Sequence, residues 1–175
     1  PMLTVNYVAP AWDAGDRTAV AVEILGDVAF GPNSDIYRKL VIDERRLQSL
    51  QASFGLSRDP GFIRITAMVT DPSDVDAVRA ELLAEVERYR TDLVDEKKLA
   101  DTKSAARYGF LMRLETHLGV ANAVSRAIVN TGRLESINDY YRTLAEVTTE
   151  DLREAARRIL VERGRTIVTL TQAEG

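Results

Sequence analysis

Alternating apolar and polar residues predict four β-strands in this chain. The first strand runs from Leu3 to Ala9, and the last runs from Thr166 to Thr171. Residues 47–54 and 62–69 alternate in the same way on either side of the turn Asp59-Pro60-Gly61. Because so short a turn reverses the chain, these two central strands are expected to form an antiparallel hairpin.

The strand at residues 47–54 has two chemically different faces. Its apolar side chains, Leu50 among them, alternate with polar ones and are expected to enter the core. The opposite face carries Ser49, Gln51 and Ser53. This strand is therefore predicted to be half-buried, with a polar face turned outward.

Apolar residues that recur every three or four positions predict helices between the strands. Asp16 offers an N-cap to a first helix, which Gly31-Pro32 terminates. A short helix is expected from Asn33 or Ser34. A longer helix begins at Pro72-Ser73 and ends near Thr91, with Ser73 and Asp76 spaced as a capping box.

The second half of the chain is predicted to be helical almost throughout. Thr148 and Asp151 have the spacing of a capping box, and Gly132 and Gly164 stand where helices are expected to end. The expected helices cover residues 95–113, 117–131, 136–145 and 149–161. Since no repeat, low-complexity tract or linker interrupts this order, residues 1–175 are predicted to form a single α+β domain.

Composition excludes several classes of partner. The chain has 175 residues, a formal net charge of -4 and a pI near 5.2, which argues against nucleic acid or a membrane surface. No apolar run approaches the roughly 20 residues that span a bilayer, and the first residues lack the order of a signal peptide. A cytoplasmic or periplasmic location is expected, and the two remain open because the chain has no cysteine.

The residues needed for common catalytic chemistry are missing. The chain contains one histidine, His117, and no cysteine, so it cannot assemble a histidine- or thiolate-based zinc site by itself. No G-x-S-x-G elbow accompanies that histidine, and neither phosphate-binding glycine motif occurs. We therefore expect His117 to have a structural role at a helix start, and we expect no cofactor in this chain.

Several segments resemble a known family when their order and spacing are taken together. Residues 3–11 read LTVNYVAPA, residues 34–41 read SDIYRKLV, and residues 147–152 read VTTEDL. Together with residues 19–30 and 47–53, they resemble the C-terminal, non-catalytic domain of the insulinase/pitrilysin family of zinc peptidases, of the mitochondrial-processing-peptidase type. The resemblance implies an antiparallel sheet covered by several helices.

The resemblance also implies a division of labour between two homologous halves. In that family the zinc motif H-x-x-E-H lies in the first half, and the second half helps to enclose the peptide. We therefore expect an accessory domain that forms part of the substrate chamber and does not itself catalyse, within a zinc metalloendopeptidase. Its expected partners are a peptide, bound by Ser49, Gln51 and Ser53, and a zinc-bearing N-terminal domain or subunit, with hetero- or homodimers possible.

One departure from the family pattern bears on activity. Many such domains carry an arginine and, seven residues later, a tyrosine that contact the substrate. The corresponding positions here are Ile42 and Ser49. If the parent protein is an active peptidase, a second polypeptide is expected to supply that pair. The alternatives are a non-enzymatic structural or assembly subunit of the same fold and a free-standing ligand-binding module.

Overall fold

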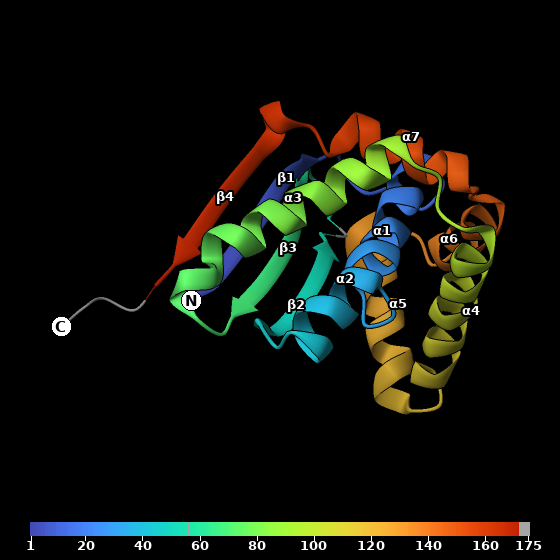
Figure 1. The fold of residues 1–175 in the computed structure, drawn as a ribbon. Coiled ribbons are helices and arrows are strands. Elements are labelled where there is room, and N and C mark those ends of the chain that lie inside the picture. Colours follow the sequence, from blue (N-terminus) through green and yellow to red (C-terminus); the bar gives the residue numbers. More distant parts are fainter. Residues whose placement is uncertain (56, 172–175) are drawn as a thin grey trace.

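A four-stranded antiparallel sheet forms one layer of the molecule (Figure 1). The computed structural model describes residues 1–55 and 57–171. The strands are β1 (Met2–Ala9), β2 (Leu47–Phe54), β3 (Gly61–Val69) and β4 (Arg165–Leu170), in the order β2-β3-β1-β4. The predicted hairpin of the two central strands is confirmed, and the first strand lies between β3 and the last strand.

Seven α-helices make up most of the rest of the described chain. They are α1 (Arg17–Phe30), α2 (Asp35–Tyr37), α3 (Val75–Thr91), α4 (Glu96–Arg113), α5 (His117–Thr131), α6 (Ser136–Glu146) and α7 (Thr149–Ile159). Short π- and 3-10 turns adjoin them at η1 (Arg38–Asp43), η2 (Pro72–Asp74) and η3 (Glu162–Gly164). The predicted α+β class with an antiparallel sheet and several helices is therefore confirmed.

One face of the sheet is covered by helices, and the other face is open. Leu3, Val5 and Tyr7 of β1 are buried, as are the alternate residues Ile63 and Ile65 of β3. Helices α1, α3 and α7 pack over this apolar face, while α4, α5 and α6 lie at one end of the molecule (Figure 1). The core therefore lies between the sheet and helices α1, α3 and α7.

Several predicted helix ends are correct. Asp16 accepts a hydrogen bond from the backbone of Thr18 at the start of α1, and Gly132 adopts a left-handed φ of 72° after α5. Thr148 and Asp151 form the predicted capping box, with each side chain accepting a hydrogen bond from the other's backbone N–H. The sequence predicts these caps correctly because each one involves residues only a few positions apart.

Two local predictions are wrong. Ser73 does not cap the third helix; Asp71 instead caps the η2 turn by accepting a hydrogen bond from the backbone N–H of Ser73. The last helix ends at Ile159, and Gly164 belongs to η3. The short helix expected from Asn33 or Ser34 is confirmed, because Ser34 caps α2 by accepting a hydrogen bond from the backbone N–H of Tyr37. It continues as the π-turn η1, which the sequence did not predict.

The first turn of α5 requires a glycine. Thr116 caps α5 by accepting a hydrogen bond from the N–H of Gly119, which brings this residue against the end of α4. A Cβ at position 119 would lie 1.6 Å from the carbonyl oxygen of Arg113, a backbone atom that cannot move aside as a side chain could. By contrast, a Cβ at Gly61 would meet nothing within 4 Å.

Gly119→Ala is therefore expected to destabilise the domain, whereas Gly61→Ala serves as a matched control. Relieving the clash requires the turn to shift, which should lower the free energy of unfolding by about 1–3 kcal/mol. Thermal unfolding followed by circular dichroism measures the effect. Equal melting temperatures for the two variants would contradict the close approach described here.

Candidate functional site

The three residues predicted to contact a peptide lie together on the open face of the sheet. Ser49, Gln51 and Ser53 occupy alternate positions of β2 and are all exposed. Leu47, before a β-bulge, and Leu50 are buried on the other face. Among the described residues, none of the three polar side chains makes a hydrogen bond, so their donors and acceptors remain available for a ligand.

Strand pairing extends this polar face across the sheet. Gln51 lies opposite Thr66 and Ser53 lies opposite Arg64 of β3, and Arg64 in turn pairs with Asn6 of β1. The Arg64 Nε donates a hydrogen bond to Asn6 Oδ1 at 2.9 Å, which holds the guanidinium over the sheet. The sheet thus presents hydroxyl, amide and guanidinium groups in adjacent rows.

Arg64 and Asn6 were not singled out from the sequence. Each stands at a polar position within an alternating strand, so the pattern indicates that both face outward. Their proximity to Ser53 depends on the register of three strands, and an alternating pattern does not contain that information. Arg64 adds a cation beside the neutral side chains of Ser49, Gln51 and Ser53.

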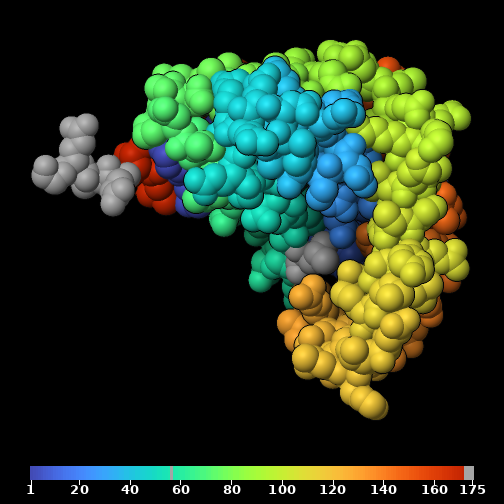
Figure 2. Space-filling model, turned by 60° about the horizontal axis from the view of Figure 1, so that its bottom comes forward, coloured from blue at the N-terminus to red at the C-terminus, as the bar shows by residue number. Residues whose placement is uncertain are grey.

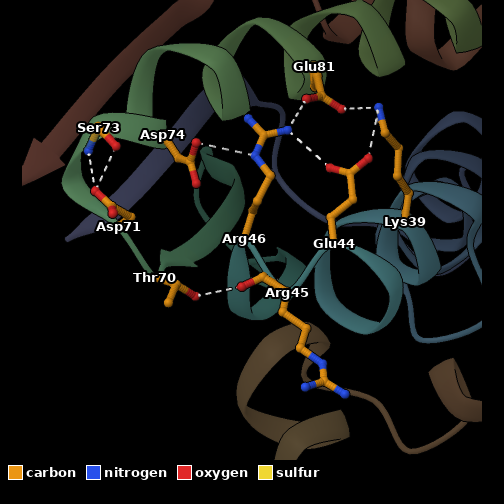
Figure 3. A network of polar contacts seen from close by, with 9 residues as sticks. All are labelled: Lys39, Glu44, Arg45, Arg46, Thr70, Asp71, Ser73, Asp74 and Glu81. Carbon is orange, nitrogen blue, oxygen red and sulfur yellow. Dashed lines mark hydrogen bonds and ion pairs between the residues drawn. The ribbon is translucent and has the colours of Figure 1, made fainter.

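A network of ion pairs fixes the start of β2 (Figure 3). Arg46, only 20 % exposed, lies 2.5 Å from Glu81 of α3, 3.2 Å from Glu44 and 3.5 Å from Asp74. Lys39 of η1 contacts Glu81 at 2.6 Å. Burial opposes the ionised form of Glu81, but the hydrogen bonds from Lys39 and Arg46 outweigh it and lower the pKa of Glu81.

The neighbouring arginine is arranged in the opposite way. Arg45 has a left-handed φ of 55°, and its carbonyl oxygen accepts a hydrogen bond from the Thr70 hydroxyl at 3.1 Å. Its guanidinium points away from the ion pairs around Arg46 (Figure 3). Because the positive φ of Arg45 turns the two successive side chains in different directions, Arg46 anchors β2 to α3 whereas Arg45 is exposed to solvent.

Nothing in the described residues supplies a metal centre. His117 is exposed at the first position of α5, and no group of three or more His, Asp or Glu residues within 1–55 and 57–171 is arranged to hold a metal ion. Ile42, in η1, has 57 % of its side chain exposed but carries no hydrogen-bonding group. In the same part of the chain, no helix has both the length and the apolar composition to cross a membrane.

A buried carboxyl group lies on the covered side of the molecule. Glu23 of α1 sits near Trp12 and Tyr140, and loss of solvent raises its pKa to about 7. Both neighbours favour the ionised form, yet within the described residues neither Glu23 Oε2 nor the Trp12 indole N–H completes a well-aligned hydrogen bond. With this pKa the carboxyl group is neutral below about pH 6 and about half ionised near pH 7.

Aromatic rings join this site to the helical end of the molecule. The Trp12 and Tyr140 ring centroids lie 6.1 Å apart, and Tyr140 meets Tyr141 edge to face at 4.9 Å. Tyr141 then contacts Phe110 of α4 at 5.1 Å. This cluster attaches α4 and α6 to the loop after β1.

Sequence comparison places the chain among peptidase domains. The family model described as the peptidase M16 inactive domain matches residues 1–106. A curated relative, the probable mitochondrial-processing peptidase subunit alpha-1 of Arabidopsis thaliana, is 21 % identical over 169 residues. That match covers 89 % of this chain but only 33 % of the relative, so the chain spans about a third of its length.

Solved structures show the same fold. A protease from Helicobacter pylori superposes with a TM-score of 0.85 at 19 % identity, covering 95 % of this chain and 39 % of that protein. The inactive peptidase domain of a Bordetella parapertussis protein described as a zinc protease gives a TM-score of 0.83 at 19 % identity. In that case the match covers 99 % of this chain and 91 % of the other.

Arg46→Met is expected to lower the free energy of unfolding by about 1–2 kcal/mol, because Glu81 loses its closest partner within a partly buried network. Arg45→Met, one position away, should change it by less than about 0.5 kcal/mol. Urea unfolding of both variants measures the difference. Comparable losses would mean that the network in Figure 3 does not anchor β2.

Glu23 should make the free energy of unfolding fall as pH rises. Its pKa is raised on folding, so its contribution is fully present below the unfolded value of about 4.5 and is lost as pH rises through about 7. Glu23→Gln should therefore flatten this part of the pH dependence and make the domain more stable at pH 8, by roughly 2–3 kcal/mol.

The measurement is urea unfolding at several pH values between 4 and 8. Glu135→Gln, an exposed carboxylate at the start of α6, controls for the change of net charge. Parallel pH profiles for wild type and Glu23→Gln would show that the buried carboxyl group is ionised without cost.

Proposed function

Since this chain belongs to the family of peptidase M16 inactive domains, we propose that it is the accessory C-terminal domain of a zinc metallopeptidase. The family match over residues 1–106 is the observation that carries this proposal. The domain forms part of the wall of the substrate chamber. Bond cleavage belongs to a homologous zinc-bearing half, because the described residues of this chain offer no metal-binding group.

The polar face of β2 is the surface proposed to meet the peptide. Ser49, Gln51 and Ser53 are exposed and make no hydrogen bond to the described residues, and Arg64 lies beside them in the next strand. Hydroxyl and amide groups hydrogen-bond to peptide backbones of any sequence. Such a face suits a domain that positions an extended peptide without selecting a particular side chain.

Transition-state stabilisation is proposed to come from elsewhere. Ile42 donates no hydrogen bond, and Ser49 is much shorter than a tyrosine. Arg46 cannot substitute for the missing family arginine, since three carboxylates of the domain engage its guanidinium. A second polypeptide that carries the arginine and tyrosine pair is therefore part of the proposal, as a homologous subunit of a dimer.

The test uses the full-length protein, alone and with such a homologous subunit. Ser49→Ala/Gln51→Ala/Ser53→Ala should raise the KM for an unstructured peptide about three- to tenfold and leave kcat nearly unchanged, because these contacts bind substrate without touching the reacting bond. Ser104→Ala, exposed on α4, is the control. Steady-state kinetics measure both constants.

An unchanged KM in the triple variant would exclude this face as the peptide contact. Peptidase activity in the chain of residues 1–175 alone, or one zinc per chain that is lost with His117→Ala, would overturn the accessory role itself.

A further inference from the structure

Helix α5 is apolar on more sides than its packing explains. Arg126 is the only arginine, lysine, aspartate or glutamate of this helix, which runs from His117 to Thr131. Ala127 is its only buried residue. Small residues such as Gly119 and Ala123 lie on its less exposed side. Its large apolar side chains are 40–73 % exposed; they are Leu118, Val120, Val124, Ile128 and Val129.

These apolar side chains form two lines along the helix. Leu118 and Val129 are eleven residues, or about three turns, apart and lie on one side. Val120, Val124 and Ile128 follow one another at intervals of four along another side. Exposed large apolar side chains on two sides of one helix are normally covered by a neighbouring element, so we expect another domain to pack against α5.

The end of α4 continues this surface. Tyr108, Leu111 and Met112 are 65 %, 55 % and 44 % exposed. We call these residues, with the large apolar residues of α5, the α4–α5 face. The two helices project from the body of the molecule, and Figure 2 shows a hollow between α5 and the end of the β2–β3 hairpin. The face is thus presented on a protruding element that another domain can reach.

The α4–α5 face carries positive charge. Arg107, Arg113 and Arg126 form no ion pair with any described residue, although Arg113 lies over the ring of Phe110 at 5.9 Å. Glu115 is the single acidic residue between positions 107 and 126. This basic rim stands out on a chain whose net charge is -4, and it calls for a partner with acidic side chains around an apolar patch.

The size of the face indicates a tethered partner. A helix of 15 residues is about 22 Å long and about 10 Å wide, so one side of α5 offers about 220 Å², which the end of α4 extends. A free-standing dimer typically buries about 800 Å² on each partner, whereas contacts between domains of one chain are commonly smaller. A second copy would also bring these arginines towards one another.

We infer that the α4–α5 face is the surface on which the zinc-bearing half of the same protein docks, through an apolar patch rimmed by acidic side chains. The inference rests on the proposed function for the identity of that half. A bilayer is a poorer match, because a flat surface meets only one side of a helix whose apolar residues occupy several sides. Docking there would hold the two halves in register around the peptide.

The test places benzoylphenylalanine at position 129 of the full-length protein, because Val129 is 73 % exposed and the domain does not need it for its core. Irradiation should cross-link this position to the zinc-bearing half of the same molecule, which mass spectrometry of the digested monomer identifies. The same residue at Leu93, 53 % exposed outside the α4–α5 face, should give no such link.

A second variant gives a functional readout. Val129→Glu should reduce kcat/KM about tenfold while the zinc content stays unchanged, because a carboxylate would be buried in an apolar contact. Leu93→Glu should keep full activity.

Cross-links to a second copy, to lipids of anionic vesicles added during irradiation, or to nothing at all would overturn the inference. A different result would contradict the proposed function without contradicting the docking surface. A protein that cross-links as expected but lacks zinc and activity would retain the docking surface and lose the peptidase role.

Discussion

Burial of α1 is the constraint on which the rest of this domain depends. Nine of its fourteen residues are buried, and it contacts β2 as well as helices α3, α4, α6 and α7. The packing is close: a Cβ at Gly26 would lie 3.3 Å from the Cβ of Ala52 in β2. A helix enclosed on so many sides leaves little room for polar groups, and Glu23 remains there only with a raised pKa.

The two faces of the sheet differ in role because of this arrangement: one packs into the core, and the other is open. The inner side of the sheet and α1 are occupied by core packing, so the outer side is the part of the sheet that is open to a ligand. The ion pairs of Arg46 anchor the start of β2 to α3, and the polar positions Ser49, Gln51 and Ser53 follow from that anchor. A peptide contact built on a strand held at its base is more precise than one built on a loop.

The division of labour in the proposed peptidase follows from the same chemistry. A chain with one histidine and no cysteine lacks the ligands of a histidine- or thiolate-based zinc site, so in this proposal the metal that activates water comes from another domain. In this proposal the polar sheet face and the apolar α4–α5 face have different tasks. One is suited to a transient, sequence-tolerant ligand, and the other to a permanent neighbour.

The sequence by itself determined the strands, most helix boundaries and the absence of common catalytic motifs, because periodicity and capping depend on residues a few positions apart. It also placed Ser49, Gln51 and Ser53 on one outward face. Only the tertiary structure decided the strand order, the meeting of Arg46 with Glu81 across 35 positions, and the approach of Trp12 and Tyr140 to Glu23.

The exposure of α5 is another feature that only the tertiary structure decided. Its pattern predicts a helix correctly, but whether an apolar side chain is covered depends on which elements pack beside it, and no local pattern encodes that choice. Alternation and helical spacing assign a residue to a face. The neighbour on that face is set by the folding of segments far apart in the chain.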